Sequence, residues 1–258
     1  VDGTPRSYLL HLPPNPRGKP LIIALHPLGS NPMLMEAMTG LSSLADDEGF
    51  IVAYPEGTKL SEDGIRSWNA RFCCRDAWNA NVDDIGFLTK LIDNLTERHH
   101  VRGVLVTGFS NGGMLAHLAG IELSDRITAI APVAATIGRE ILEMRPKRPL
   151  PVLMIHGTDD RLLPLTGTEG GRLLPVARAI DYWVGMNDCD RTPVIEERGG
   201  IEMSRYTCGF GSADVVVHRV RGAGHVWPGS RVRMRSEHDP RTLDASKVIV
   251  EFFLSRLR

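Results

Sequence analysis

The sequence predicts an α/β protein in which a mainly parallel central sheet carries helices on both faces. Two observations predict it: short continuous apolar runs bounded by Pro or Gly, which are typical of strands buried on both faces, and segments of helical periodicity between those runs. Strands that alternate with helices of this length pair in parallel through crossover connections. Because the 258 residues show no internal repeat and no linker, we treat residues 1–258 as a single domain.

The expected strands follow from the apolar runs in chain order. Residues 8–12 alternate weakly before two prolines and suit an outer strand, whereas residues 20–26, PLIIALH, indicate a strand buried on both faces. Further buried strands are expected at residues 50–54, 104–107, 127–133, 152–156 and 215–220.

The expected helices lie between these runs. Apolar residues recur at spacings of three and four from Ile85 to Leu95, which places them on one face of a helix. Asp83 or Asp84 is placed to cap the start of this helix. Further helices are expected at residues 111–122, 176–186 and 244–256.

Composition and charge exclude several classes of protein. The chain is 42% hydrophobic and 24% charged with a formal net charge of -1, which is ordinary for a globular protein and lacks the basic excess of a nucleic-acid binder. No apolar run approaches the ~20 residues of a membrane-spanning helix. We therefore expect no nucleic-acid partner and no membrane span. The start at Val1 leads us to expect that a targeting segment has been removed or that the chain has been trimmed.

Four cysteines permit two disulfides and suggest an oxidising compartment. Cys189 and Cys208 flank a polar, turn-rich stretch, and we expect them to close a surface loop with a stabilisation of about 3 kcal/mol. Cys73 and Cys74 are adjacent, so they either form a vicinal disulfide or remain thiols. No C-x-x-C or H-x-x-x-H spacing accompanies the cysteines, so we expect no metal site.

The strand expected at residues 104–107 runs directly into the sequence GFSNGG and then into a helix. A G-x-S-x-G motif in this context places a serine on a tight, strained turn with its hydroxyl above the sheet. Gly108 and Gly112 leave room for the backbones to approach, although glycine-rich turns after strands are also common for structural reasons. Ser110 is therefore the predicted nucleophile, and the N–H of Asn111 at the helix start is a predicted oxyanion donor.

A serine nucleophile requires a histidine base, and the base requires a carboxylate that fixes its tautomer and stabilises the imidazolium. The strand expected at residues 152–156 is followed by two candidates, Asp159 and Asp160, of which only one would face the site. We favour Asp160 and interpret the other as a turn or cap residue.

In hydrolases of this topology the histidine follows the serine and the carboxylate in chain order. The glycine-rich loop after residues 215–220, RGAGHVWPG, holds one histidine, His225. His26 and His156 also follow buried strands, but their place in the chain excludes them as the base. His225 is therefore the predicted base.

A second oxyanion donor is expected from the loop after residues 20–26, whose sequence is HPLGS. Pro27 has no N–H and cannot donate. Leu28 is the better candidate, donating alongside Asn111.

Taken together, the motifs LHPLGSN, VAYPEG, SWNARFCC, VDDIGFL, VTGFSNGGM, APVAA, HGTDDRLLP, RYTC and GAGHVWPGS resemble the polyhydroxybutyrate depolymerase-like esterases. This family has the α/β-hydrolase fold and includes feruloyl and acetyl xylan esterases. The resemblance extends from about Asp2 to the final helix. It departs at His26-Pro27, where members of the fold often carry His-Gly, and the proline stiffens the oxyanion loop.

The resemblance implies a secreted or periplasmic serine esterase that needs no cofactor, with Ser110, Asp160 and His225 as its triad. It also implies the bond between Cys189 and Cys208, and it is compatible with a vicinal bond between the other two cysteines. No long insertion that would form a large lid is visible, which suits bulky or polymeric esters.

The residues that face the substrate are less constrained by the sequence. Trp227 either forms a wall of the acyl or alcohol pocket or packs over the terminal helix. Trp68, in a polar loop after a strand, is a candidate for the rim of the cleft, and His26 is a third candidate near the substrate. The methionines at positions 33, 35 and 38 either pack a helix or present an adaptable apolar surface to acyl chains.

The function expected from these residues is hydrolysis of a carboxylic ester through an acyl-enzyme on Ser110. The sequence leaves the substrate open among polyhydroxybutyrate, aromatic polyesters, and feruloyl or acetyl esters of plant polysaccharide. The alternatives are a serine peptidase or an acyltransferase on the same fold, or a hydrolase fold without activity that serves as a binding protein.

Overall fold

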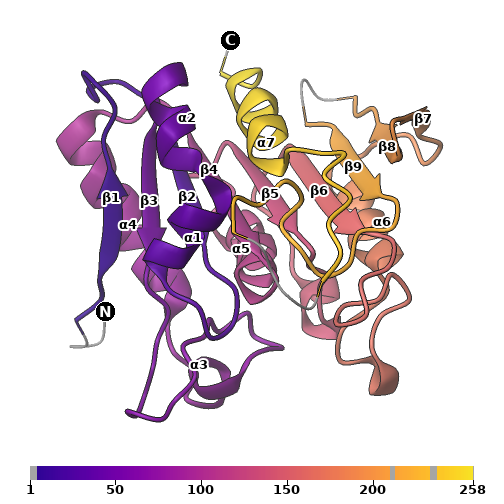
Figure 1. Ribbon diagram of the computed structural model, residues 1–258, viewed down its shortest axis with the longest axis horizontal. Coiled ribbons are helices and arrows are strands. Elements are labelled where there is room, and N and C mark those ends of the chain that lie inside the picture. Colours follow the sequence, from indigo (N-terminus) through magenta and orange to yellow (C-terminus); the bar gives the residue numbers. More distant parts are fainter. Residues whose placement is uncertain (1–4, 210–212, 233–236, 258) are drawn as a thin grey trace.

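One sheet forms the centre of the molecule. The computed structural model describes residues 5–209, 213–232 and 237–257, and within these ranges nine strands are paired in the order β1-β3-β2-β4-β5-β6-β9-β8-β7 (Figure 1). They are β1 (Tyr8–His11), β2 (Leu21–Leu25), β3 (Ile51–Pro55), β4 (Val104–Phe109), β5 (Ala129–Val133), β6 (Val152–Gly157), β7 (Val194–Arg198), β8 (Ile201–Tyr206) and β9 (Val215–Val220). The strands from β3 to β9 in this order are parallel; β1 pairs antiparallel at one edge, and β8 and then β7 add antiparallel at the other.

The predicted strands are confirmed. Each apolar run forms a strand, and β2 through β6 are buried along their whole length, as expected for a sheet covered on both faces. The first strand lies at the edge and pairs antiparallel with β3, in agreement with its weak alternation.

The stretch between the distant cysteines is a β-hairpin rather than the expected surface loop. Strands β7 and β8 pair antiparallel, and β8 adds to β9. Every residue of β7 is exposed, so this strand carries no apolar run that would reveal it. Gly199 and Gly200 connect the two strands with φ of 57° and 82°, the positive values that a two-residue hairpin turn requires.

Helices cover both faces of the sheet (Figure 1). The helices are α1 (Pro32–Thr39), α2 (Leu41–Glu48), α3 (Arg75–Asn79), α4 (Asp84–His99), α5 (Asn111–Glu122), α6 (Val176–Met186) and α7 (Ala245–Leu254), with 3-10 turns η1 (Arg139–Glu143) and η2 (Glu169–Gly171). Helices α4, α5 and α6 share one apolar cluster with the sheet, and α1, α2 and α7 share the other. No helix in the described ranges is long and apolar enough to cross a bilayer.

The predicted helices α4, α5, α6 and α7 are confirmed, and the cap of α4 is Asp83, whose Oδ1 accepts from the Gly86 N–H at 2.8 Å. Helices α1 and α2 were not predicted, because each is only eight residues long. Met35 and Met38 lie on the buried face of α1, whereas Met33 is 69% exposed. Two of the three methionines therefore pack this helix onto the sheet.

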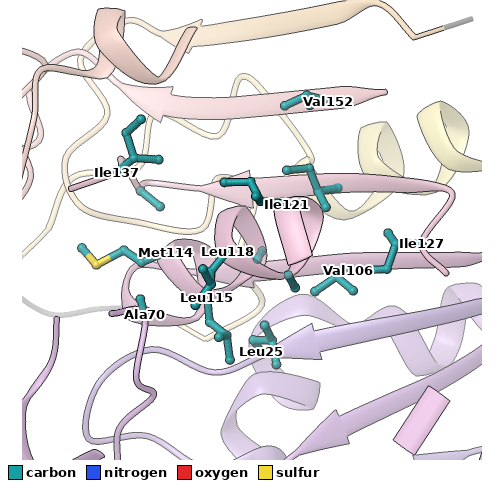
Figure 2. Packing of buried hydrophobic residues seen from close by; sticks show 14 of the residues in the cluster. Leu25, Ala70, Val106, Met114, Leu115, Leu118, Ile121, Ile127, Ile137 and Val152 are labelled. Atoms are coloured by element: carbon teal, nitrogen blue, oxygen red, sulfur yellow. The ribbon is translucent and has the colours of Figure 1, made fainter. Parts of the chain in front are cut away.

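Helix α5 runs through the middle of the core and fixes the turn that precedes it. All of its residues from Asn111 to Ile121 are buried. Figure 2 shows Met114, Leu115 and Leu118 of α5 among side chains from the neighbouring strands and loops. A turn attached to so buried a helix is held rigidly, because any tilt of the helix would open cavities on several sides.

The expected disulfide between Cys189 and Cys208 is present, and Cys73 and Cys74, which the sequence left open, form a vicinal disulfide. Cys189 follows α6 and Cys208 follows β8, so their bond encloses the β7–β8 hairpin. Tyr206 pairs with Val215 at the start of β9, so this disulfide lies at the edge of the sheet opposite to the carboxyl ends of the parallel strands.

Replacement of both Cys189 and Cys208 by serine is expected to lower the free energy of unfolding by about 3 kcal/mol, because the unfolded chain regains the freedom of the closed loop. Urea unfolding measures the loss. The kcat of the variant is expected to match that of the wild type at a temperature where both are folded, since the bond lies far from the carboxyl edge. An unchanged unfolding free energy would contradict the stabilising role of this bond.

Candidate active site

Ser110 lies on a strained turn between β4 and α5. Its φ of 55° and ψ of -118° are uncommon for a residue with a side chain, and its N–H donates to the Val133 carbonyl at 3.0 Å. A Cβ on Gly112 would lie 2.3 Å from the Leu25 carbonyl oxygen, and one on Gly108 would lie 2.4 Å from the backbone of Gly112. Both glycines are therefore required by close backbone approach, as the motif predicts.

Asp160 and His225 lie together at the carboxyl ends of β6 and β9. His225 Nδ1 is 2.8 Å from Asp160 Oδ2, and both side chains are almost completely buried. The other carboxylate oxygen, Oδ1, accepts from the N–H groups of Leu162 at 3.0 Å and Leu163 at 2.8 Å. Asp159 is exposed and accepts from the adjacent Thr158 hydroxyl. Of the two candidate carboxylates, Asp160 is therefore the one that contacts the histidine.

The serine turn and the histidine meet through Phe109. The rings of Phe109 and His225 are 4.9 Å apart between centroids. Because Phe109 directly precedes Ser110, this contact brings the His225 loop against the serine turn. The structure thus pairs Asp160 with His225 and places Phe109, the neighbour of Ser110, against the His225 ring; the three predicted residues come from the segments that follow β4, β6 and β9.

Two residues support this group without having been predicted. Glu237 Oε2 accepts from the backbone N–H of His225 at 2.9 Å. His156 Nε2 donates to the Leu163 carbonyl at 2.8 Å and lies 3.4 Å from Asp160 Oδ2. Burial lowers the pKa of His156 although Asp160 opposes the shift, so His156 is neutral with its proton on Nε2. Glu237 lies in a polar loop without hydrophobic periodicity, so its contact with His225 could not be predicted from the sequence.

His26 anchors the predicted oxyanion loop and does not face a substrate, so its predicted role near the substrate is wrong. The side chain is fully buried. Its Nε2 accepts from the Gly57 N–H at 2.9 Å, which requires the proton on Nδ1, and Nδ1 donates to the Pro27 carbonyl at 2.8 Å. Burial lowers the pKa of His26 to about 4, consistent with this neutral tautomer. Leu28, the predicted donor, follows directly and is 38% exposed.

The two predicted substrate-facing tryptophans are also buried in the core. Trp68 is not on a cleft rim: it has no exposed surface, and its Nε1 donates to the His26 carbonyl at 2.9 Å. Trp227 does not form a pocket wall, because its Nε1 donates to the Ser246 hydroxyl of α7 at 3.0 Å. Of the two interpretations of Trp227, packing against the terminal helix is the correct one.

The buried histidines predict an acid-sensitive fold. Burial lowers the pKa of His26 and His218 to about 4 and that of His117 to about 3, from the ordinary value of 6.5. Between pH 6.5 and 4 the unfolded chain binds protons that the folded chain does not, so stability falls as the pH falls. The expected slope is about 1.4 kcal/mol per pH unit for each such histidine.

Urea unfolding at pH 7 and pH 5 measures this loss. His218→Gln is expected to flatten the pH dependence, because it removes one of the groups that bind a proton only in the unfolded chain. Equal unfolding free energies at the two pH values would contradict the prediction.

In the part of the chain that the structure describes, no group of three or more His, Cys, Asp and Glu side chains is arranged to hold a metal ion. The polar groups that converge at the carboxyl edge of the sheet are those of acyl-transfer chemistry: a hydroxyl on a strained turn, a buried carboxylate with a histidine, and the free N–H of a helix start.

Comparison with known proteins agrees with this chemistry. No family model matches the chain. NocK of Nocardia uniformis subsp. tsuyamanensis, an esterase by name, is 31% identical over 283 residues, which cover 98% of this chain and 80% of NocK. Feruloyl esterase B of Piromyces equi is 28% identical over 221 residues, covering 81% of this chain but only 40% of that protein.

Solved structures bear on the fold. The acetyl xylan esterase from Aspergillus awamori superposes with a TM-score of 0.59 at 16% identity, covering 85% of this chain and 88% of that one. At this identity the likeness establishes the α/β-hydrolase fold. The identity to NocK over nearly the whole chain shows that the chain belongs to the same family of esterases, with the α/β-hydrolase fold, and is a carboxylic ester hydrolase.

Proposed function

We propose that this esterase acts through an acyl-enzyme on Ser110, with His225 as the general base and Asp160 as the carboxylate that orients it. The observation that carries the proposal is the 2.8 Å contact between His225 Nδ1 and Asp160 Oδ2. Since Asp160 accepts a proton donor at that position, Nδ1 carries the proton and Nε2 keeps its lone pair for the serine.

The reaction would proceed in two acyl transfers. The hydroxyl oxygen of Ser110 attacks the ester carbonyl carbon while Nε2 of His225 takes the hydroxyl proton. The N–H groups of Leu28 and Asn111 receive the oxyanion, and the imidazolium returns its proton to the leaving alcohol. Water then attacks the acyl-enzyme, with Nε2 again taking and returning a proton, and Ser110 is released.

As substrate we propose a feruloyl or acetyl ester of plant polysaccharide. The names of the Piromyces equi relative and of the Aspergillus awamori structure support this class. Polyesters such as polyhydroxybutyrate are the second candidate, because the sequence motifs resemble depolymerases. We further propose that the protein is secreted, since two disulfides suit an oxidising compartment.

Covalent labelling tests the mechanism. A serine-directed fluorophosphonate is expected to add one label per chain, and peptide mapping is expected to locate it on Ser110. Prior denaturation of the protein should abolish labelling, which serves as the control for nonspecific reaction. A label on another serine would contradict the assignment, and absence of any label would favour a binding protein without activity.

A substrate panel tests the class of ester. Initial rates would be compared for nitrophenyl acetate, methyl ferulate, acetylated xylan, polyhydroxybutyrate film and an aromatic polyester. We expect methyl ferulate or acetylated xylan to give the highest kcat/KM among the natural linkages. Faster release from a polyester would overturn the polysaccharide proposal, and product esters formed with added alcohol would indicate acyl transfer.

A further inference from the structure

The side chain of Asn111 is used for a purpose other than catalysis. Its Oδ1 accepts from the Trp68 N–H at 2.8 Å, and its Nδ2 donates to the Trp68 carbonyl at 3.1 Å. Both residues are buried, so the paired bonds are shielded from water. The backbone N–H of Asn111 stays available, because the first residue of a helix has no intrahelical acceptor.

Trp68 also reaches the other half of the predicted oxyanion hole. Its Nε1 donates to the carbonyl of His26 at 2.9 Å, two residues before Leu28, and the His26 ring lies 4.9 Å from the indole ring between centroids. One residue therefore contacts both segments that supply oxyanion donors. These segments follow the neighbouring strands β2 and β4, whose pairing ends at Leu25 and Gly108. Leu28 and Asn111 each lie three residues beyond that pair, so the sheet alone does not fix the distance between the two N–H groups.

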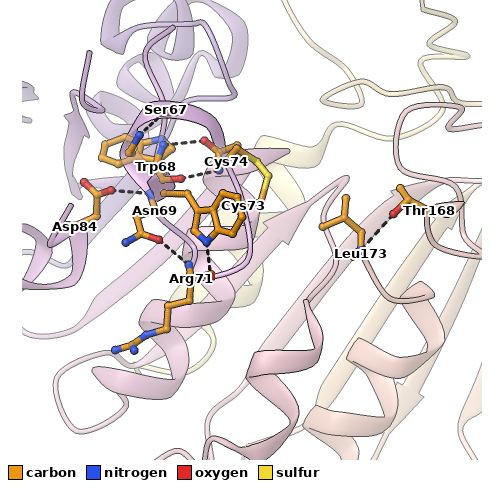
Figure 3. The surroundings of a disulfide bond; sticks show 12 residues. Ser67, Trp68, Asn69, Arg71, Cys73, Cys74, Asp84, Thr168 and Leu173 are labelled. Atoms are coloured by element: carbon orange, nitrogen blue, oxygen red, sulfur yellow. Dashed lines mark hydrogen bonds between the residues drawn. A yellow bond between two sulfur atoms is a disulfide. The ribbon is translucent and has the colours of Figure 1, made fainter. Parts of the chain in front are cut away.

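The backbone around Trp68 is itself anchored (Figure 3). The N–H of Asn69 donates to Asp84 Oδ2 at 2.7 Å, and Asp84 Oδ1 is paired with the Arg6 guanidinium at 2.6 Å. The N–H of Cys74 donates to the Trp68 carbonyl at 3.2 Å. The backbone at Trp68 is thus held by two hydrogen bonds, one to Asp84 of helix α4 and one from Cys74 of the vicinal disulfide.

We propose that Trp68 and the side-chain amide of Asn111 are positioning residues that set the spacing of the two oxyanion donors. This inference rests on the proposed acyl-enzyme mechanism. Two N–H groups stabilise an oxyanion only when both lie about 2.7–3.1 Å from the same oxygen, and the stabilisation is larger in the transition state than in the bound substrate. Loosening the spacing should therefore lower kcat while leaving KM almost unchanged.

Asn111→Ala tests the first contact, since it removes both bonds to Trp68 and keeps the backbone N–H. We expect kcat for a nitrophenyl ester to fall by about 10- to 100-fold with little change in KM. A trifluoromethyl ketone, whose hemiketal oxygen mimics the oxyanion, should bind more weakly by the same factor. Rates are expressed per active site, titrated with the fluorophosphonate after complete reaction, so that unfolded protein does not count.

Asn187 offers a matched control. It is similarly buried and bonds to both polar groups of one residue, accepting from the Leu150 N–H at 3.0 Å and donating to the Leu150 carbonyl at 2.7 Å, and it donates to the Ala213 carbonyl at 2.8 Å as well. Leu150 precedes β6, at the edge of the sheet away from the site. Because it removes one more buried bond, Asn187→Ala should lower the melting temperature at least as much as Asn111→Ala, with kcat and inhibitor affinity unchanged.

Trp68→Phe tests the second contact and serves if Asn111→Ala does not fold. It removes the Nε1–H bond to the His26 carbonyl and keeps the backbone bonds to Asn111. Its control is Trp183→Phe on α6, which removes a similarly buried Nε1–H bond, to His117 Nδ1 at 3.0 Å. We expect a selective loss of kcat and of ketone affinity at Trp68 and only a loss of stability at Trp183.

The outcomes separate this inference from the mechanism on which it rests. If the fluorophosphonate labels Ser110 but the Asn111 and Trp68 variants keep wild-type kcat per active site, the positioning role is refuted and the acyl-enzyme stands. If both variants lose kcat no more selectively than their controls, the contacts serve stability alone. If the wild type is not labelled at Ser110, both proposals fall.

Discussion

Ser110→Ala is expected to lower kcat for a nitrophenyl ester by about 10⁶-fold, because the nucleophile and its base act as one unit and neither works without the other. The residual rate would come from the oxyanion donors and from binding alone. KM is expected to change little, since a hydroxyl contributes little to binding of the ground state. Parallel assays of the two proteins, with the variant purified apart from any wild-type contamination, measure the effect.

Ser110→Gly is the informative companion of this variant. Both are expected to be inactive, but the glycine variant should be more stable than the alanine variant, because φ of 55° with ψ of -118° suits a residue without a side chain. Thermal melts compare the two. An alanine variant that hydrolyses esters within tenfold of the wild type would refute the acyl-enzyme on Ser110.

The parts of the fold that the sequence predicted are those in which one physical signal dominates. Strands such as Leu21–Leu25 are buried on both faces, so an apolar run is sufficient to reveal them. The fully exposed strand Val194–Arg198 has no such signal, and its pairing is visible only through the Gly-Gly turn that follows it. The short helix Pro32–Thr39 carried a start signal, because Asn31 caps it and Pro32 opens it.

In the candidate site, too, some residues could be placed from the sequence and others could not. The places of Ser110, Asp160 and His225 could be predicted because the carboxyl ends of parallel strands lie at one edge of the sheet, so a residue just after a strand has a known place. Trp68, Trp227 and His26 stand in loops, where sequence gives no direction for a side chain. In the structure each of these rings is buried and makes a hydrogen bond, so the three residues stabilise the loops and do not face a substrate.

Contacts between loops could not be predicted from the sequence for the same reason. Glu237 reaches the backbone of His225 from twelve residues further along the chain, and His156 approaches Asp160 from the end of the same strand that precedes it. Neither contact follows from spacing alone, because the path of each loop depends on what it packs against. Such residues become visible only once the backbone is known.

Asp160→Asn is expected to lower kcat by about 10⁴-fold, and the surroundings of the carboxylate explain why an isosteric change should cost so much. Oδ1 accepts two backbone N–H groups, from Leu162 and Leu163. An amide NH₂ cannot replace an acceptor there, so the asparagine oxygen must occupy this position. The amide nitrogen is then forced into the position of Oδ2, beside Nδ1 of His225.

That orientation reverses the hydrogen bond to the histidine. The amide nitrogen donates to Nδ1, so the ring proton moves to Nε2, and the base can no longer accept the proton of Ser110. In this orientation the NH₂ group also faces the Nε2–H of His156, which lies 3.4 Å from the Oδ2 position, and this contact is unfavourable. The alternative orientation would place the NH₂ group against two backbone donors, so the contact with His156 adds strain without restoring the tautomer.

Asp159→Asn provides the matched control, since it makes the same chemical change one residue away on an exposed side chain whose hydrogen bond is to Thr158. It is expected to keep kcat within about twofold, because surface substitutions of this kind rarely disturb a site. Steady-state kinetics at pH 8 compare the two variants. Equal losses in both would assign the effect to the loop as a whole, and a near wild-type Asp160→Asn would show that His225 is oriented by another group.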